Sequence, residues 1–328
     1  MARLVADLGG NCCRLALVAQ GGLSFGAAKN YRNEQFGSFR DLLTSYLAQE
    51  DAPQISEMVI AVAGPVSADV AKLTNRGWRI SAQDLSAQLN GARVHVLNDL
   101  SALGHALPML QGPDLAQVHS LGDAETHPQK LVIGIGTGFN LSPLTVTSNG
   151  AICLDSEYGH VALPLDVYQA LAARLAAHLP ARSGDMAGDM AAELRTEFLT
   201  EFRTVECCFS GRGFEALYAA ASPDSPALPA AEIMARAQQP EISSFLDFYA
   251  QILALLARNL LKGFMPRGGL YFAGTVARSL LCSPAKEAFV AEFSRPDPQF
   301  PDIKAPVFCI LDDGAALKGC AGFTFPAL

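Results

Sequence analysis

The sequence has no run of basic residues, no Cys-x-x-Cys pair and no apolar stretch of the length that crosses a membrane. It contains 24 Lys and Arg against 32 Asp and Glu, giving a formal net charge of −8. Because binding to a phosphate backbone needs a basic stripe, this balance argues against nucleic acid as the main partner. The longest apolar candidate, residues 252–261, is interrupted by Arg258 and Asn259, so we expect no membrane partner.

The eight cysteines stand at positions 12, 13, 153, 207, 208, 282, 309 and 320. With the histidines they match no zinc-binding spacing, and adjacent cysteines rarely pair with each other. We therefore expect buried free thiols and a reducing environment. Asp7 interrupts the apolar segment that a secretory signal would need, so we expect a cytoplasmic protein.

A chain of 328 residues, half of them hydrophobic, fits two domains with separate cores. In the first part, short apolar runs predict a strand meander over 2–8, 13–19 and 23–29, and further strands over 58–63 and 93–97. The spacing of apolar residues predicts a helix over 39–49, and Ser81 resembles the cap of a second, which runs to about Leu89.

The second part repeats strands that end in glycine turns. Strands are expected over 131–135, 141–146, 151–154, 269–273 and 307–311. Helices dominate residues 165–265, and the segment 245–264 is apolar on more than one face, which indicates a buried helix. A last helix, 314–322, should pack back on the first domain. We expect a small domain of residues 1–109 plus 308–328 and a large domain of residues 110–307, joined by a hinge.

Asn98 and Asp99 follow an apolar strand and precede a helical pattern, which is where open α/β sheets place their chemistry. An Asp at this point is more often a helix cap. Two glycine turns, Asp7-Leu8-Gly9-Gly10 and residues 134–138, also follow strands and can bring N–H groups around an anion. Taken alone, the first is better explained as a plain hairpin, and the second is equally a hairpin or a phosphate nest.

Two further segments carry polar groups. Residues 157–160 read Glu-Tyr-Gly-His, and Glu206 precedes the Ser-Gly-Arg-Gly of residues 210–213. Hydrogen-bonding side chains at one bend suit a polyhydroxylated ligand, although a surface loop explains the first segment as well. The second segment is typical of a helix N-terminus with a compensating Glu.

Taken together, these motifs resemble those of the bacterial glucokinases of the hexokinase/actin-like kinase superfamily, nearly end to end and in the same order. The family's Asp-x-Gly-Gly-Thr-Asn-x-Arg-Leu opening is similar to residues 7–15. Other matching segments are residues 73–78 (Leu-Thr-Asn-x-x-Trp), 98–102 (Asn-Asp-Leu-x-Ala), 108–110 (Pro-Met-Leu), 134–138 (Gly-x-Gly-Thr-Gly), 157–160, 206–214 and 268–275.

The resemblance implies a two-lobed α/β fold of ribonuclease-H-like topology, with the active site in the cleft between the lobes. It implies ATP-dependent transfer of a phosphoryl group to the 6-hydroxyl of glucose or a closely related hexose, in a homodimer. The implied sugar ligands are Asn98, Asp99, Glu157, His160 and Glu206, with Asp99 as general base. The implied ATP contacts are Gly9, Gly10, Asn11, Gly136, Thr137, Gly138 and Gly274. Asp7 would hold Mg²⁺ through water.

The chain departs from the family pattern mainly on the nucleotide side. Asn11, Cys12 and Cys13 replace a Thr, an Asn and a small residue, and Thr275 and Tyr158 each replace a Gly. Two alternatives follow. One is a sugar-binding regulatory or degenerate homologue with little ATP turnover, which the altered residues 11–13 favour. The other is a kinase of the same fold for another hexose.

Overall fold

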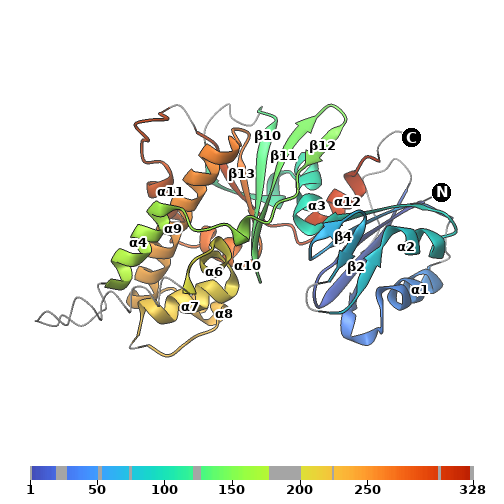
Figure 1. Cartoon of the computed structure of the whole chain (residues 1–328), viewed down its shortest axis with the longest axis horizontal. Helices are drawn as coiled ribbons and strands as arrows, with labels where there is room; N and C mark the ends of the chain where they lie inside the picture. Colours follow the sequence, from blue (N-terminus) through green and yellow to red (C-terminus); the bar gives the residue numbers. More distant parts are fainter. Residues whose placement is uncertain are drawn as a thin grey trace, which may run out of the picture. The chain divides into compact units, whose positions relative to one another are not determined.

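The computed structural model describes residues 2–19, 28–50, 54–73, 76–120, 127–176, 201–223, 225–301 and 304–325. The chain divides into two compact units. The first comprises Met1–Gln111, Leu144–Asp155 and Asp312–Leu328, and the second comprises Gly112–Pro143 and Ser156–Leu311. Both units are mixed α/β, as the sequence predicts (Figure 1).

The first unit is built on a five-stranded sheet with the order β3-β2-β1-β4-β8. Its strands are β1 (Ala2–Leu8), β2 (Cys12–Ala19), β3 (Lys29–Arg32), β4 (Ile55–Val62) and β8 (Arg93–Asn98). The first two predicted strands of the meander are confirmed. The third prediction, 23–29, falls mostly on residues outside those described, and the strand observed there is β3. A small sheet of β5 (Val66–Ser67), β6 (Val70–Lys72) and β7 (Arg79–Ser81) accompanies it.

Helices cover both faces of this sheet (Figure 1). They are α1 (Phe39–Gln49), α2 (Ala82–Gln88), α3 (Asp99–Ala106) and α12 (Ala315–Gly322). Alternate residues of β1 point to opposite faces: Leu4 packs in the core under α1 and α2, whereas Val5 packs in the core under α3 and α12. Ser38 caps α1 and Ser81 caps α2.

The register of the first sheet brings three strand ends together. Strands β1, β4 and β8 run parallel, and their pairing aligns Leu8 with Val62 and Val62 with Asn98. The turn that follows β1 and the Asn98-Asp99 pair that ends β8 therefore lie at one edge of the sheet.

The second sheet has six strands in the order β12-β11-β10-β13-β14-β9, and all but β12 and the end of β11 belong to the second unit. Besides β12, its strands are β9 (Leu115–His119), β10 (Gln129–Ile135), β11 (Phe139–Thr147), β13 (Leu270–Ala273) and β14 (Val307–Ile310). Strands β10, β13 and β14 are parallel. Strand β12 (Gly150–Cys153) pairs with the last four residues of β11, and this hairpin is grouped with the first unit.

The described helices of the second unit surround one long apolar helix. They are α4 (Leu165–Ala176), α6 (Val205–Phe209), α7 (Gly211–Ala221), α8 (Ala230–Ala235), α9 (Pro240–Phe264), α10 (Thr275–Leu281) and α11 (Lys286–Phe293). Helix α9 contains the predicted buried segment and contributes Phe245, Tyr249 and Leu253 to the core. The Tyr249 hydroxyl donates to the Cys208 carbonyl at 3.1 Å, so its polar end is satisfied within that core.

All eight cysteines are free. Cys13, Cys208, Cys309 and Cys320 are buried, as expected. The expectation of buried thiols is wrong for the remaining positions, because 12, 207 and 282 are exposed and 153 is half-buried.

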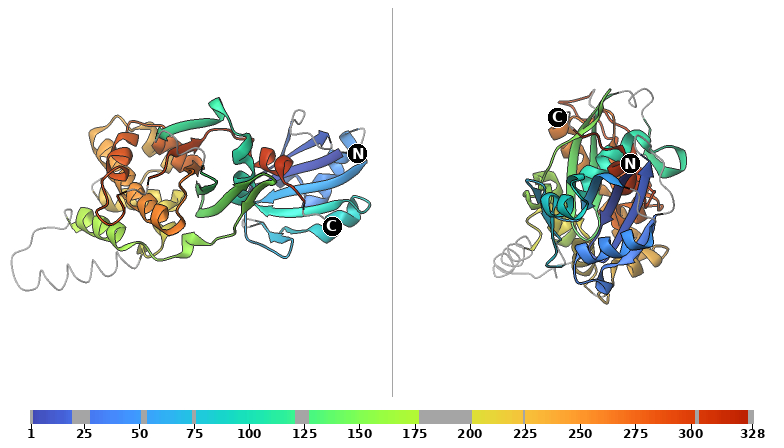
Figure 2. Two further views of the ribbon diagram at one scale, coloured as in Figure 1. Left: turned by 90° about the horizontal axis from the view of Figure 1, so that it is seen from above. Right: turned by 90° about the vertical axis from the view of Figure 1, so that its right-hand side faces the viewer.

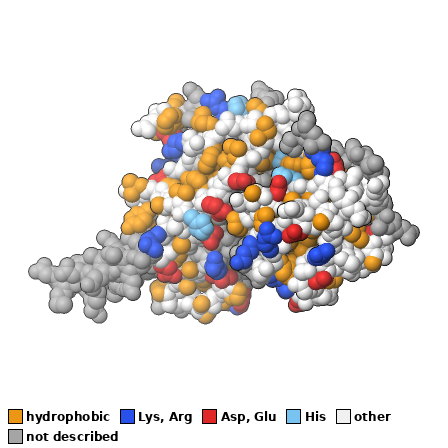
Figure 3. Space-filling model, turned by 45° about the vertical axis from the view of Figure 1, so that its right-hand side comes forward, with side chains coloured by type: hydrophobic (Ala, Val, Ile, Leu, Met, Phe, Trp, Pro, Cys, Tyr) orange, Lys and Arg blue, Asp and Glu red, His pale blue; other side chains and the backbone are white. Residues whose placement is uncertain are grey.

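No helix in the described part of the chain is long and apolar enough to cross a membrane. On the face drawn in Figure 3, the described Lys and Arg side chains lie among Asp and Glu rather than in a continuous basic stripe.

The contact between α3 and α12 depends on Gly319. The two helices lie side by side (Figure 2), and a Cβ added to Gly319 would lie 1.7 Å from the Ala102 carbonyl oxygen. We expect Gly319→Ala to lower the free energy of unfolding by about 1–3 kcal/mol. The added methyl would clash with the backbone of a packed helix, which cannot move aside as a flexible side chain could. Thermal or urea unfolding measures this.

Gly263→Ala is the matched control, because nothing lies within 4 Å of the Cβ that it would add on α9. Relief of the helix-propensity penalty of glycine should raise stability there, by up to about 1 kcal/mol. Equal effects of the two substitutions would contradict the tight contact at Gly319.

Candidate active site

The residues predicted to form the site fall into two groups, one in each unit. The first unit holds one glycine turn, the carboxylate predicted to bind the metal and two predicted sugar ligands: Asp7, Gly9, Gly10, Asn11, Asn98 and Asp99. The second unit holds the other glycine turn, the predicted nucleoside loop and three predicted sugar ligands: Gly136, Thr137, Gly138, Gly274, Glu157, His160 and Glu206.

The turn between β1 and β2 presents backbone N–H groups to solvent. The Gly9 N–H donates to the Cys12 carbonyl at 3.0 Å and closes the turn. Gly10 is half-buried and Asn11 is exposed, and their N–H groups find no acceptor among the described residues. Neighbouring free N–H groups of this kind attract anions.

Asn33, which the sequence analysis does not single out, contacts this turn. It is fully buried, and its side-chain Nδ2 donates to the carbonyls of Gly9 at 2.8 Å and Gly10 at 3.2 Å. Its backbone N–H donates to the Asn11 carbonyl at 2.9 Å. No motif links Asn33 to the turn, because the contact arises only when β3 pairs with β2.

Asp7 lies one residue before the end of β1 and pairs with Arg14 across the hairpin. The Arg14 Nη1 is 3.6 Å from Asp7 Oδ2 and also donates to the Asp313 carbonyl. Burial raises the pKa of Asp7, and the Arg14 guanidinium partly opposes this. The carboxylate is therefore held in place by its own hairpin.

Asn98 is the N-cap of α3, a role that the sequence analysis considered for an Asp at this point. Its Oδ1 accepts from the Leu100 N–H and its Nδ2 donates to the Gly64 carbonyl, each at 3.0 Å. The Asn98 amide also donates to the Asp99 carboxylate, a contact that lowers the pKa of Asp99. An amide can donate two hydrogen bonds and accept two, so one acceptor site remains for a ligand.

Asp99 follows as the first residue of α3, with Oδ1 accepting from the Leu100 N–H at 3.0 Å. Burial and the negative charge of Asp7 raise the pKa of Asp99 to about 6, against the hydrogen bonds that lower it. A carboxyl with this pKa is mostly ionised at pH 7 yet accepts a proton readily, which is the property of a general base.

In the second unit, the turn between β10 and β11 contacts Glu206 of α6. The Gly136 N–H donates to the Gly138 carbonyl at 3.0 Å, and the Phe139 N–H donates to Glu206 Oε2 at 3.1 Å. A Cβ on Gly138 would lie 2.8 Å from that Oε2, so a larger residue there would displace the Glu206 carboxylate from its present position. Thr137 is exposed at the tip of the turn.

The segment Tyr158–His160 forms a 3-10 helix, η5, and leaves the side chains of Glu157 and His160 exposed. Asn140 on β11 fixes it: its Oδ1 accepts from the Tyr158 N–H at 3.1 Å, and its Nδ2 donates to Glu157 Oε2 at 3.3 Å. A Cβ on Gly159 would lie 2.3 Å from the Phe139 carbonyl and 3.3 Å from the Glu206 Cβ. The structure therefore brings Glu157, Glu206 and the glycine turn together.

Gly274 joins the same group through the pairing of β13 with β10. It precedes α10 with φ of +93°, and a Cβ there would lie 2.3 Å from the Ile135 carbonyl. The two positions where the family has glycine, Tyr158 and Thr275, are not among the described residues with positive φ. Both side chains therefore fit their backbone without strain in the left-handed region.

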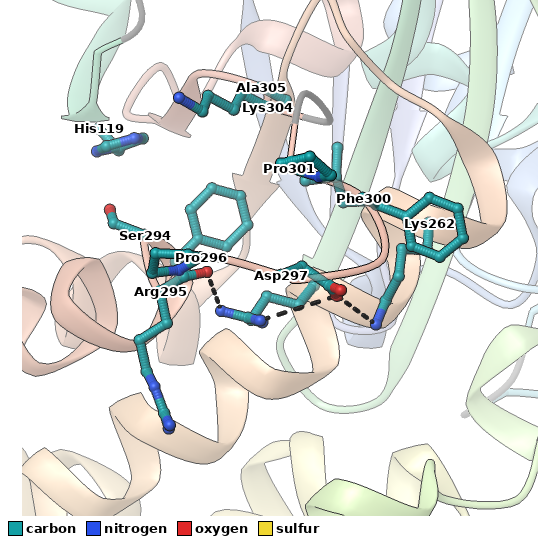
Figure 4. Close-up of a pocket in the computed structure, with 13 residues that line it drawn as sticks. His119, Lys262, Ser294, Arg295, Pro296, Asp297, Phe300, Pro301, Lys304 and Ala305 are labelled. Atoms are coloured by element: carbon teal, nitrogen blue, oxygen red, sulfur yellow. Dashed lines mark hydrogen bonds and ion pairs between the residues drawn. The ribbon is translucent and has the colours of Figure 1, made fainter.

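The pocket drawn in Figure 4 contains none of the predicted site residues. It lies between α9 and the connection from α11 to β14, where Lys262 Nζ is 3.2 Å from Asp297 Oδ2. Lys304 lines it just before β14, whereas Gly274 follows the end of β13. Since β13 and β14 are parallel, the pocket and the predicted nucleoside loop lie at opposite ends of the strands.

Solved structures place this architecture among the sugar kinases. The structure matches the ROK hexokinase from Thermus thermophilus with a TM-score of 0.65 at 17% identity, over 98% of this chain and 97% of the other, which shows a shared fold. It matches the glucokinase from an Antarctic psychrotroph with a TM-score of 0.75 at 27% identity, over 98% of each chain.

The sequence comparisons give the family. A model of the glucokinase family matches residues 4–325, and the chain therefore belongs to this family. A glucokinase of Chromobacterium violaceum is 28% identical over 97% of this chain and 88% of its own length. A glucokinase of Sinorhizobium fredii is 26% identical over 98% of this chain and 91% of its own length.

The raised pKa of Asp99 predicts a pH-dependent cost in stability. A carboxyl whose folded pKa lies above its unfolded value holds its proton longer in the folded state, so stability falls as pH rises from about 3.8 to about 6. Asp99→Asn removes the charge and keeps the acceptor for the Leu100 N–H. We expect it to be more stable than the wild type at pH 7, by on the order of 2–3 kcal/mol.

Urea unfolding of both proteins at several pH values checks this, and the difference should vanish below pH 4. Asp84→Asn, at an exposed carboxylate paired with Arg79, is the control and should show no such gain. An Asp99→Asn protein that is less stable at pH 7 would contradict the raised pKa.

Proposed function

We propose that this protein transfers the γ-phosphoryl group of ATP to the 6-hydroxyl of glucose, giving glucose 6-phosphate. Membership of the glucokinase family supports ATP and glucose as substrates. A glucokinase from Balamuthia mandrillaris with the same fold, at 20% identity and a TM-score of 0.73, was solved in complex with glucose. The observation that carries the proposal is Asp99, a carboxyl with a pKa of about 6 at the sheet edge where the β1–β2 turn also lies.

Asp99 would take the proton of the 6-hydroxyl as that oxygen attacks phosphorus. Phosphoryl transfer otherwise depends on positioning and on neutralising charge. The sugar would be held by Asn98, Asp99, Glu157, His160 and Glu206. A ring of fixed donors and acceptors selects one hexose, because an analogue that lacks a hydroxyl leaves buried polar groups unpaired.

The two glycine turns would hold the ATP phosphates, with Gly9, Gly10 and Asn11 from the first unit and Gly136, Thr137 and Gly138 from the second. Gly274 would face the nucleoside. These loops offer backbone N–H groups, and a Thr hydroxyl adds a donor at the tip of the second turn.

Asp7 would hold Mg²⁺ through water. Its negative charge is a cause of the raised pKa of Asp99, so a cation beside the two carboxylates would relieve their repulsion. Mg²⁺ keeps several waters and takes few protein carboxylates, relying on phosphate oxygens for the rest.

We further propose a ribonuclease-H-like topology for the two lobes, residues 1–109 plus 308–328 and residues 110–307. The strand order β3-β2-β1-β4-β8, with β2 antiparallel to β1, supports it. The lobes would close on sugar and exclude the water that would otherwise accept the phosphoryl group. The protein would act as a cytoplasmic homodimer. The family match does not favour the alternative of a degenerate sugar-binding homologue.

Asp99→Asn tests the assigned base. The amide keeps the size and the hydrogen bond of the carboxyl but cannot accept the proton, so kcat should fall by about two or more orders of magnitude. The affinity for glucose, measured by calorimetry, should change much less. Near-normal turnover would remove Asp99 from this role, and Asp84→Asn is again the control.

Asn11→Thr tests the altered phosphate turn. A Thr offers a compact hydroxyl, whereas the Asn carbonyl oxygen repels phosphate when it faces inward. The change should raise kcat or lower KM for ATP, by roughly ten- to a hundredfold if it adds one charge-assisted hydrogen bond. KM for glucose should stay the same. Steady-state kinetics at saturating glucose measure this, and a loss of activity in Asn11→Thr would contradict it.

A further inference from the structure

We propose that Asn33 is a positioning residue that orients the β1–β2 turn toward the phosphates of ATP. The proposal rests on the proposed function, because it takes the anion at this turn to be the nucleotide. Asn33 lies behind the turn and touches no substrate in this assignment.

The place of Asn33 is set by the pairing of β3 with β2. That ladder aligns Arg32 with Cys12, so the next residue along β3 faces the turn that precedes β2. The chain then bends into a short 3-10 helix, Asn33–Gln35. The side chain of Asn33 is 0% exposed and is therefore committed to the turn.

The three hydrogen bonds of Asn33 reach three successive carbonyls. Nδ2 donates to Gly9 at 2.8 Å and Gly10 at 3.2 Å, and the backbone N–H donates to Asn11 at 2.9 Å. In a trans peptide the carbonyl and the following N–H point in opposite directions, and the protein has no cis peptide bonds among the described residues. Drawing the Gly9 and Gly10 carbonyls onto Asn33 therefore turns the N–H groups of Gly10 and Asn11 away from it.

Those two N–H groups are the ones without an acceptor among the described residues. They are also accessible to a ligand, since Gly10 is only partly buried and Asn11 is exposed. The three carbonyls of the turn are thus hydrogen-bonded to Asn33, and the N–H groups of Gly10 and Asn11 remain available on the opposite side. An anion such as phosphate binds to free N–H groups of this kind.

The chemistry of the contact requires an amide. Both carbonyls accept from Nδ2, whereas the buried Oδ1 of Asn33 has no hydrogen-bond partner among the described residues. An isosteric Asp would set a carboxylate oxygen against two carbonyls. An unpartnered buried oxygen lowers stability, so this side chain is better explained by the geometry that it imposes on the turn than by its contribution to folding.

The backbone contact also accounts for the tolerance of Asn at position 11. The Asn33 N–H holds the Asn11 carbonyl, so the path of the backbone there does not depend on the side chain of residue 11. The departure at this residue should then alter one side-chain contact to phosphate and leave the N–H donors in place.

The test is Asn33→Leu, which keeps the branched shape and removes both donors. Titration calorimetry with a non-hydrolysable ATP analogue, Mg²⁺ and glucose present, should show Kd for the analogue raised by about tenfold or more, the loss of one charge-assisted hydrogen bond. Kd for glucose alone should stay within about twofold of the wild type, and KM for ATP should rise while KM for glucose does not. Asn33→Ser, which keeps one donor and covers a failure of the Leu variant to fold, should fall between the two.

Asn259→Leu is the matched control. Its Nδ2 likewise donates to several acceptors, both Asp166 carboxylate oxygens and the Leu255 carbonyl, but on α4 and α9. It should lose stability without changing Kd for the analogue. Unchanged analogue binding in Asn33→Leu and Asn33→Ser, or an equal loss for analogue and glucose, would overturn the positioning role. A wild type that binds no analogue would refute the proposed function and the positioning role together.

Discussion

The parallel register of β1, β4 and β8 is the constraint on which the first unit depends. It aligns Leu8, Val62 and Asn98 at one edge of the sheet, so a glycine turn and a pair of polar residues that are far apart in the sequence lie at the same edge. The alternation of side chains along β1 then decides which face of the sheet each residue occupies. Val5 packs under α3 and α12, and Asp7, two residues further on, lies on the same face. Burial and the negative charge of Asp7 raise the pKa of Asp99, and both follow from the ordinary geometry of a sheet and its covering helices.

The second unit meets a different constraint, the close approach of neighbouring segments at glycine residues. Gly138, Gly159 and Gly274 each stand where a Cβ would lie less than 3 Å from a neighbouring atom: Glu206 Oε2, the Phe139 carbonyl and the Ile135 carbonyl. The segments that contain these three glycines are distant in the sequence but pack together around the end of β10. Any larger side chain at these positions would displace Glu206 or a neighbouring backbone segment, so the glycines allow the three segments to pack this closely.

Much of this was predictable from the sequence because it is local. The strands over 2–8 and 93–97, the helix over 39–49 and the cap at Ser81 depend on periodicity and on neighbouring residues. The motif matches also led to Asp99 and to Glu206. Sequence analysis missed Asn33, Arg14 and Asn140 as partners of site residues, because their contacts arise from strand pairing, which no local pattern encodes. The raised pKa of Asp99 depends on its burial and on the approach of Asp7, and both arise only in the folded unit.

The packing of α12 against α3 has a consequence for synthesis. Helix α3 begins at the proposed base and ends at Ala106, whereas its partner begins at Ala315. As the chain emerges from the ribosome, the face of α3 that packs on α12 stays exposed until the whole second unit has been synthesised. That unit can close its own core first, since its segments emerge together. The site of the proposed chemistry is therefore completed late, and a nascent chain stalled before residue 315 would expose the apolar surface that chaperones recognise.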